Sequence, residues 1–160
     1  MTAQKTDREK AQRVIAENRK ARHDYHILET WEAGIALLGT EVKSIREGRV
    51  NLRDSYARVD KGEVWLLNVH ISPYSHRGSA EHAELRQRKL LLHAHEIRKM
   101  VGQTAERGFT LVPLEVYLKN GRVKVLVGLA KGKQAHDKRE TIRRREVDRE
   151  TRAAVKSRSR

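Results

Sequence analysis

Apolar and polar residues alternate along the middle of the chain, which is the pattern of β-strands that bury one face. The alternating or apolar segments are short and are separated by turn residues, as expected for strands of four to eight residues. Between His23 and Lys131 the sequence therefore predicts about six strands. The clearest segments lie at 25–31, 56–59, 64–71, 111–118 and 123–129.

Turn residues separate these segments at three places. Asn120-Gly121 predicts a type I′ hairpin turn because both residues accept positive φ. Asp60-Lys61-Gly62-Glu63 predicts a second hairpin loop with Gly62 at positive φ, and Glu32-Ala33-Gly34 predicts a turn after the first strand. Pro113 cannot donate a ladder hydrogen bond, so we expect an edge or a bulge at its strand position.

Two stretches have helical rather than strand spacing. Residues 41–46 predict a short helix with Thr40 as its N-cap and an end near Gly48. Residues 95–107 carry apolar side chains at helical spacing, and Gly108 follows as a candidate C-cap. The polar stretch 72–88 has few apolar anchors and predicts a mobile loop.

Short strands joined by tight turns predict a mainly β fold: a small closed barrel of about six strands with two or three short helices. A sandwich remains possible on the pattern alone. The barrel is expected over 17–131, after a flexible basic segment at 1–16. The highly charged tail at 132–160 is expected to be disordered when free and, because Arg, Glu, Lys and Ala favour helix, to become helical on binding.

The charge of the chain points to a polyanionic partner. The 160 residues include 35 Lys and Arg against 21 Asp and Glu, a net charge of +14. The tail alone holds eleven basic and five acidic residues and no Trp, Phe, Tyr, Leu or Met. Basic groups that neutralise phosphates release counterions, so nucleic acid is the favoured partner. A membrane surface is disfavoured because the tail lacks apolar anchors.

Composition also excludes several classes of protein. Cysteine is absent, which excludes a disulfide framework, a thiolate zinc site and a cysteine nucleophile. The first ten residues are polar, and the longest uncharged apolar stretch, 33–39, is far too short to span a membrane. We therefore expect a cytoplasmic protein without a membrane partner.

The motifs that could carry catalysis or bind a cofactor do not meet their requirements. The histidines lack the carboxylate and helical spacing of a zinc site. Gly128 to Lys133 has one residue too few between its glycines for a phosphate loop, and Gln134 follows the lysine. No carboxylates group around a nucleophile. We expect no metal, no cofactor and no enzymatic activity.

One run of residues favours RNA. Cations, hydrogen-bond donors and an aromatic residue are interleaved just before the first strand, where cations can follow phosphates and rings can stack on bases. Further basic groups are expected on turns and strand ends, Arg46, Arg88 and Lys124 among them. The predicted RNA-binding residues of the run are Asn18, Arg19, Lys20, Arg22, His23 and Tyr25.

Several long motifs resemble the small protein B family, the SsrA-binding proteins of bacteria. The resemblance covers roughly residues 18–140, and its runs are NRKARHDYHILETWEAGIALLGTEVKSIREGRVNLRDSYARV (18–59), RKLLLH (88–93), TLVPLEVYLKNGRVKVLVGLAKGK (110–133) and HDKRE (136–140). It implies an oligonucleotide-binding-like (OB-like) barrel that holds the tRNA-like domain of transfer-messenger RNA in trans-translation, the rescue of stalled ribosomes. It further implies delivery to the vacant decoding site with elongation factor Tu, and a tail that lies as a helix in the empty messenger channel.

The same resemblance carries particular residues over by motif. Asn18, Glu32, Leu91 and Lys124 are expected on the RNA-binding surface, although from sequence alone Leu91 is as readily a core residue. Gly132 is expected at the hinge of the tail. The ribosome-contacting residues are expected to be Lys131, Gly132, Lys133, His136, Asp137, Lys138 and Arg139.

The chain departs from the family pattern at Glu84-Leu85, where an Asp-Pro step is expected. Two other functions remain to be weighed. A generic ribosomal or cold-shock-like protein would bind any structured RNA with a steep salt dependence. An RNA-modifying enzyme would use His136 and Asp137, and its turnover would be lost in His136→Ala.

Overall fold

The computed structural model describes residues 12–74, 82–106, 108–133, 143–147 and 149–153. The longer strands are β1 (Gln12–Glu17), β2 (Tyr25–Ile35), β4 (Tyr56–Asp60), β5 (Glu63–Leu67), β7 (Arg88–Leu91), β8 (Phe109–Lys119) and β9 (Arg122–Gly132). Two short strands are β3 (Val50–Asn51) and β6 (His70–Ile71). The helices are α2 (Arg19–Asp24), α3 (Gly39–Arg46) and α4 (Ala94–Thr104).

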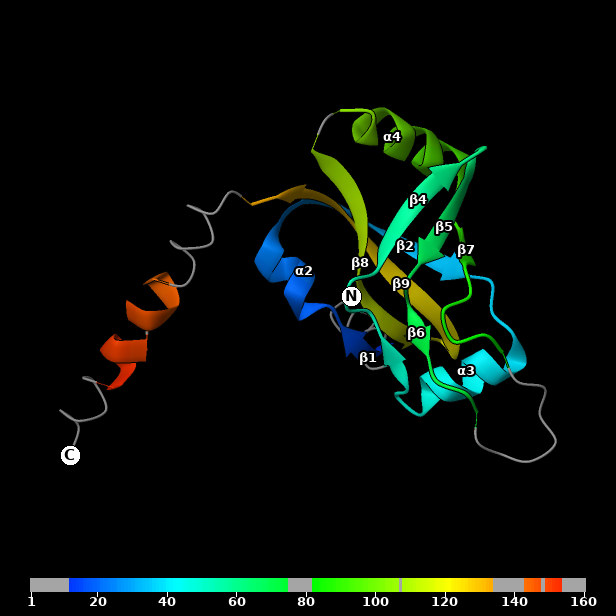
Figure 1. Ribbon diagram of the computed structural model, residues 1–160, viewed down its shortest axis with the longest axis horizontal. Coiled ribbons are helices and arrows are strands. Elements are labelled where there is room, and N and C mark those ends of the chain that lie inside the picture. The colour runs from blue at the N-terminus through cyan, green and yellow to red at the C-terminus, as the bar shows by residue number, and fades with distance from the viewer. Residues whose placement is uncertain (1–11, 75–81, 107, 134–142, 148, 154–160) are drawn as a thin grey trace, which may run out of the picture.

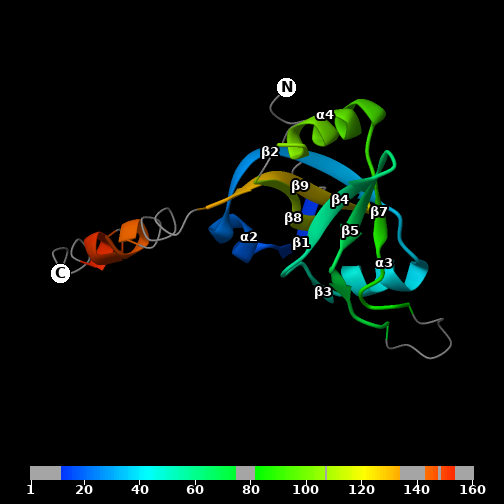
Figure 2. The same ribbon diagram turned by 45° about the horizontal axis from the view of Figure 1, so that its top comes forward.

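Six antiparallel strands close into a barrel. Their order is β8-β4-β5-β7-β2-β9, and β9 pairs back onto β8, so the ring has no open edge. β1 adds to β8 beside the ring, and β3 pairs with β6 in a separate two-stranded sheet. Figure 1 and Figure 2 show α4 and α3 at opposite ends of the barrel, with α2 beside β1 and β8. The closed barrel of about six strands is confirmed over the sandwich.

Hairpin turns and bulges shape the barrel as the sequence predicts. Asn120 and Gly121 have φ of 51° and 76°, which is the type I′ geometry between β8 and β9. The register of β8 shifts between Pro113 and Glu115, so the predicted bulge at the proline is confirmed. A second bulge, between Ile27 and Glu29 of β2, helps the longest strands bend around the ring.

The core fills the inside of this ring. Its buried residues come from every strand of the barrel together with Ile45 of α3 and Met100 of α4. A second, smaller cluster lies under α2, where Ala21 packs against Val112, Leu114 and Ala130. The two clusters hold α2, α3 and α4 against the strands, and the site described below depends on that arrangement.

Two predicted features are wrong in detail. Glu32-Ala33-Gly34 is not a turn, because β2 continues to Ile35 and these three residues pair with Leu126, Val125 and Lys124 of β9. The expected four-residue loop at 60–63 is a two-residue turn, since Asp60 and Glu63 pair with each other. Gly62 does have the predicted positive φ, 76°.

The segment expected to be flexible at 1–16 is also corrected. Gln12 to Glu17 form β1, which pairs with the end of β8, and Ile15 and Ala16 pack against the core. The folded domain therefore begins before residue 17, because these apolar side chains pack against the core. Residues 1–11 lie outside the described residues.

The beginning of α3 differs from the prediction as well. Leu38, not Thr40, is the N-cap, and its N–H donates to the Glu41 carboxylate at 2.9 Å. Thr40 instead lies within the helix, and its hydroxyl is 2.9 Å from Nδ1 of the buried His82. α3 ends at Arg46, and Gly48 follows at a φ of 79°, as predicted.

An ion network anchors the described part of the polar stretch 72–88. Arg88 and Glu41 are fully buried and form an ion pair, and Arg86 donates to the other oxygen of Glu41 at 2.5 Å. The guanidinium of Arg88 also donates to the carbonyl oxygens of Val69, Ala83 and Glu84 at 2.8, 3.3 and 3.1 Å. The prediction of a mobile loop is therefore wrong for residues 82–88, whereas 75–81 lie outside the described residues.

In the tail, residues 143–147 and 149–153 are helical, in keeping with their composition, and the Thr151 hydroxyl donates to the Val147 carbonyl at 2.8 Å. Of the helices described, none is long and apolar enough to cross a membrane.

Candidate nucleic-acid interface

The barrel brings together three predicted RNA-binding residues that are far apart in the sequence. Glu32 lies on β2, Leu91 on β7 and Lys124 on β9, and Gly34 of β2 pairs with both Leu91 and Lys124. The three side chains line one open pocket of about 360 Å³, here called the Glu32 pocket. The pocket forms because β2 pairs with β7 on one side and β9 on the other.

Leu91 is a surface residue, not part of the core. Its side chain is 52% exposed, and it lies over Gly34. A Cβ added at Gly34 would be 3.2 Å from Cβ of Leu91, so the glycine leaves the space that Leu91 occupies. An exposed leucine beside an acid and a lysine provides an apolar contact for a base or a ribose.

Hydrogen bonds from two residues of β8, Tyr117 and Lys119, hold the Glu32 carboxylate in place. The Tyr117 hydroxyl donates to Oε2 at 2.6 Å, and Lys119 Nζ donates to both carboxylate oxygens at 3.2 Å. Partial burial opposes ionisation of Glu32, but these hydrogen bonds and the charges of Lys119 and Lys124 outweigh it, so its pKa lies below the ordinary value. Glu32 is therefore a carboxylate, an acceptor only, at neutral pH.

The pocket offers three kinds of contact that suit a nucleotide. The Glu32 carboxylate accepts from a ribose hydroxyl or a base N–H, the Lys124 ammonium attracts a phosphate, and Leu91 packs against a ring. Leu92, His93 and Glu96 complete the lining. An acidic acceptor amid basic groups favours recognition of a donor edge over simple phosphate binding.

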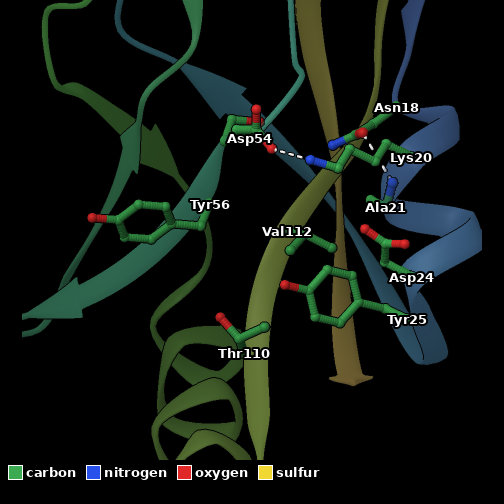
Figure 3. Close-up of a pocket in the computed structure, with 10 residues that line it drawn as sticks. Asn18, Lys20, Ala21, Asp24, Tyr25, Asp54, Tyr56, Thr110 and Val112 are labelled. Atoms are coloured by element: carbon green, nitrogen blue, oxygen red, sulfur yellow. Dashed lines mark hydrogen bonds and ion pairs between the residues drawn. The ribbon is translucent and has the colours of Figure 1, made fainter. Parts of the chain in front are cut away.

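The predicted run at 18–25, which forms α2 and the start of β2, lines a second, separate pocket, here called the α2 pocket. This pocket has a volume of about 320 Å³, and Val112 and Thr110 of β8 contribute to its lining. Figure 3 shows Tyr25 and Tyr56 on either side of it, with Lys20 reaching toward Asp54. Lys20 Nζ donates to the Asp54 carboxylate at 2.5 Å, and this bond holds the pKa of Asp54 below its usual value. Two tyrosines and a cation are suited to an unstacked base.

Asn18 is placed differently from the expectation of a direct RNA contact. Its side chain belongs to a residue only 4% exposed, and its amide donates to the carbonyls of Pro113 and Leu52 at 2.9 and 3.2 Å. Its Oδ1 accepts from the Ala21 N–H at 3.1 Å and so caps α2. These bonds occupy the amide in the free protein, so Asn18 positions α2 and the residues that α2 carries.

The remaining predicted residues near this pocket are distributed along α2. Arg19 is exposed, Arg22 donates to Glu115 at 3.3 Å, and His23 lies 3.0 Å from Asp24. Arg19 and Arg22 are exposed and so available to a phosphate backbone, whereas His23 is half-buried and Asn18 is buried. Arg46, at the end of α3, donates to the Gly121 carbonyl at 3.3 Å, beside the β8–β9 turn.

Arg88 is not a surface cation. The sequence places it with basic groups on turns and strand ends, but it is fully buried against Glu41. The prediction was wrong because a charge in an exposed-looking RQRK run carries no sequence mark of its buried partner.

Several residues at these pockets were missed from the sequence. Tyr56 lines the α2 pocket, and His93 and Tyr117 belong to the surroundings of Glu32. One signal was available: the Asn120-Gly121 turn sets a register in which Tyr117 pairs with Lys124. No turn or motif in the sequence indicated that Tyr56 or His93 would line a pocket.

The predicted tail residues are only partly described. Lys131 and Gly132 end β9, and the Lys133 N–H donates to the Asp24 carbonyl at 3.0 Å. His136, Asp137, Lys138 and Arg139 lie outside the described residues. Within the described part of the chain, no group of three or more His, Asp or Glu side chains is placed to hold a metal ion.

The chain is similar to known proteins over nearly its full length. A family model described as SmpB protein matches residues 15–157. An SsrA-binding protein from Thermosynechococcus vestitus is 60% identical over 147 residues, covering 91% of this chain and 97% of that protein. Another from Syntrophobacter fumaroxidans is 58% identical over 150 residues, covering 94% and 93%.

A solved structure is similar in both sequence and shape. It is described as "tmRNA-SmpB: a journey to the center of the bacterial ribosome", and its matching chain is 52% identical with a TM-score of 0.66. The match covers 81% of this chain and 94% of the other.

Proposed function

Because this chain belongs to the SmpB protein family, we propose that it is an RNA-binding adaptor that delivers transfer-messenger RNA to stalled ribosomes for trans-translation. Its relatives are named for binding SsrA, and the similar solved structure is of a tmRNA–SmpB assembly described with the bacterial ribosome. The observation in this chain that carries the proposal is the single pocket lined by Glu32, Leu91 and Lys124.

In this proposal the barrel binds the tRNA-like domain of the RNA. The Glu32 pocket contacts a nucleoside edge, and the α2 pocket, with Lys20, Tyr25 and the exposed Arg19, contacts a second stretch of backbone or an unstacked base. Both pockets are open and have cations in their lining. A folded RNA can bind such a surface through its backbone and exposed bases without entering a deep cavity.

The tail supplies the second half of the function. Gly132 is the hinge, and on the ribosome the basic tail at 132–160 becomes helical along the empty messenger channel, with His136 to Arg139 near the decoding centre. The helical residues 143–147 and 149–153 support a helix in this role. Elongation factor Tu joins through the RNA complex.

The protein acts in the cytoplasm and does not turn over a substrate. It works by binding, as an adaptor, and in each pocket one acid is bonded to a lysine: Asp54 to Lys20 and Glu32 to Lys119. A generic RNA-binding protein of this charge would bind structured RNAs alike.

The deciding experiment compares three RNAs at physiological salt: the tRNA-like domain of transfer-messenger RNA, an ordinary tRNA and an unrelated hairpin. We expect a preference of about tenfold or more for the first, which is roughly 1.4 kcal/mol. Glu32→Ala should reduce that affinity while leaving the circular dichroism spectrum unchanged, since Glu32 lies outside the core. The unfolding midpoint should fall modestly, because the buried Tyr117 hydroxyl loses its acceptor.

Equal binding of all three RNAs would overturn the dedicated function and leave a generic RNA-binding barrel. Glu106→Ala, just after α4, is the matched control because it removes an exposed acid that lines neither pocket. Unchanged affinity in Glu32→Ala would remove the Glu32 pocket from the RNA-binding surface.

A further inference from the structure

The Glu32 carboxylate is oriented by side chains from a different part of the barrel. Glu32 lies on β2, but both residues that bond to it, Tyr117 and Lys119, lie on β8, on the far side of β9. The register places Tyr117 opposite Lys124, and Lys124 opposite Gly34. The tyrosine therefore extends beneath the same face on which the pocket opens.

Tyr117 is poorly placed to contact RNA itself. The residue is only 2% exposed, and its hydroxyl donates to Oε2 of Glu32 at 2.6 Å. Partial burial of its phenol and the neighbouring carboxylate both raise its pKa, so the hydroxyl keeps its proton and remains a donor at every pH used for RNA binding. A buried hydroxyl that points at an exposed carboxylate can act through that carboxylate.

We propose that Tyr117 is a positioning residue for RNA recognition, which fixes Glu32 as an ionised hydrogen-bond acceptor facing the pocket of Leu91 and Lys124. The inference rests on the proposed function of that pocket. With Oε2 held by the tyrosine, the Glu32 side chain keeps one orientation, and its remaining acceptor positions face a donor of the RNA, a ribose 2′-hydroxyl or a base N–H.

Lysine alone would not fix the carboxylate in this way. Lys119 is 39% exposed at its side chain, approaches both carboxylate oxygens at the same 3.2 Å and can rotate about a flexible stem. The phenol has a single hydroxyl on a rigid, buried ring. The tyrosine therefore sets direction, whereas the lysine mainly supplies charge.

Protonation of Glu32 depends on every charged or titratable group that faces it. These are Tyr117 and Lys119 from β8 and Lys124 from β9. His93, the N-cap of α4, and Glu96, in its first turn, line the same pocket, and the Glu96 carboxylate accepts from the backbone N–H of His93 at 3.1 Å. Removing the tyrosine hydroxyl takes away a bond that favours the carboxylate, so the pKa of Glu32 should rise in Tyr117→Phe.

The test is a double-mutant cycle on the full-length chain, with the tRNA-like domain of transfer-messenger RNA as the probe. Tyr117→Phe should weaken binding about fivefold, and in a Glu32→Gln background the same change should alter affinity less than about twofold. A general structural defect would weaken binding equally in both backgrounds. Tyr74→Phe removes the same atom from a tyrosine on the segment after β6 and is the matched control.

A pH series gives the second readout. As pH falls, wild-type binding should decline when Glu32 is protonated, and in Tyr117→Phe that decline should begin at higher pH. Circular dichroism at each pH confirms that the chain stays folded. Equal loss in both backgrounds, or an unshifted pH profile, would overturn the positioning role.

The outcomes separate this inference from the proposed function. If wild-type protein binds all three comparison RNAs alike, the proposed function fails, while coupling between Tyr117 and Glu32 is still measured on whichever RNA binds. If wild-type protein is selective and no coupling is found, the inference alone fails.

Discussion

Arg88 shows how much a single side chain decides in this fold. It begins β7, is fully buried, and uses its guanidinium to join Glu41 of α3 to the carbonyl oxygens before β7. Burying an ion pair is unfavourable unless hydrogen bonds satisfy both partners, and here they do. The pair fixes the start of the strand that presents Leu91 at the pocket three residues later.

Arg88→Met should therefore destabilise the protein by about 3–5 kcal/mol, because it leaves the Glu41 carboxylate buried with Arg86 as its remaining cation. Urea unfolding followed by circular dichroism measures the change. The exposed Arg58→Met on β4 is the control, and its effect should stay within about 0.5 kcal/mol. A loss in Arg88→Met no larger than the control would refute the structural importance of the network.

The same pair gives the stability a defined pH dependence. Burial opposes ionisation of Glu41, but hydrogen bonds from Arg86, the Leu38 N–H and Arg88 outweigh it, so its folded pKa lies below the value it has in the unfolded chain. The stabilisation is fully present above that unfolded value and is lost as pH falls through the folded pKa. In Glu41→Gln the free energy of unfolding should depend less on pH in this acidic range. Unfolding measured at successive pH values tests this.

At the scale of elements, the contacts of β9 organise the molecule. It pairs along its length with β2 on one side and with β8 on the other, so it connects the Glu32 pocket to the tail. Gly128 lies in its middle, against Leu114 and Ile27 of the cluster beneath α2. The absence of a side chain there leaves room for the Leu114 side chain of β8 and the Ile27 side chain of β2 to pack over β9.

Gly128→Ala should destabilise the chain by about 1–3 kcal/mol, because the added Cβ would lie 2.8 Å from Cδ1 of the fully buried Leu114. Gly102→Ala in α4 is a control of opposite sign. Nothing lies within 4 Å of that Cβ, so the helix should gain roughly 0.5–1 kcal/mol. Thermal unfolding of both variants measures the difference, and equal midpoints would contradict the close packing at Gly128.

At the scale of the whole molecule, charge and fold are divided between barrel and tail. Ten of the 35 basic residues and five of the 21 acids follow Lys133, so removing 134–160 lowers the net charge from +14 to +9. Just after β9, the Lys133 N–H donates to the carbonyl of Asp24, at the end of α2. Both pockets are built entirely from residues before this point.

Truncation after Lys133 should therefore leave the affinity for the tRNA-like domain within about threefold of wild type while abolishing rescue of stalled ribosomes. The small remaining loss reflects fewer cations near the RNA and should diminish as salt rises. Filter binding and an in vitro tagging assay measure the two properties. Loss of RNA binding in the truncated chain would disprove the division of labour.

The sequence by itself determined the features that depend on neighbouring residues. The Asn120-Gly121 turn, the bulge at Pro113 and helices near 41–46 and 95–107 follow from backbone preferences that act over a few residues. The net charge likewise follows from composition and favours nucleic acid. Motif resemblance, not periodicity, selected Glu32 and Leu91, whereas Lys124 was also among the basic groups expected on turns and strand ends.

Only the tertiary structure decided which distant side chains meet. Closure of the ring placed Glu32, Leu91 and Lys124 in one pocket, exposed Leu91, buried Arg88 against Glu41, and turned Asn18 inward to cap α2. β2 continues through the predicted turn at Gly34 because its partners β7 and β9 supply the ladder hydrogen bonds. Local preference sets turns, but burial and pairing between strands far apart in sequence decide the surface that binds.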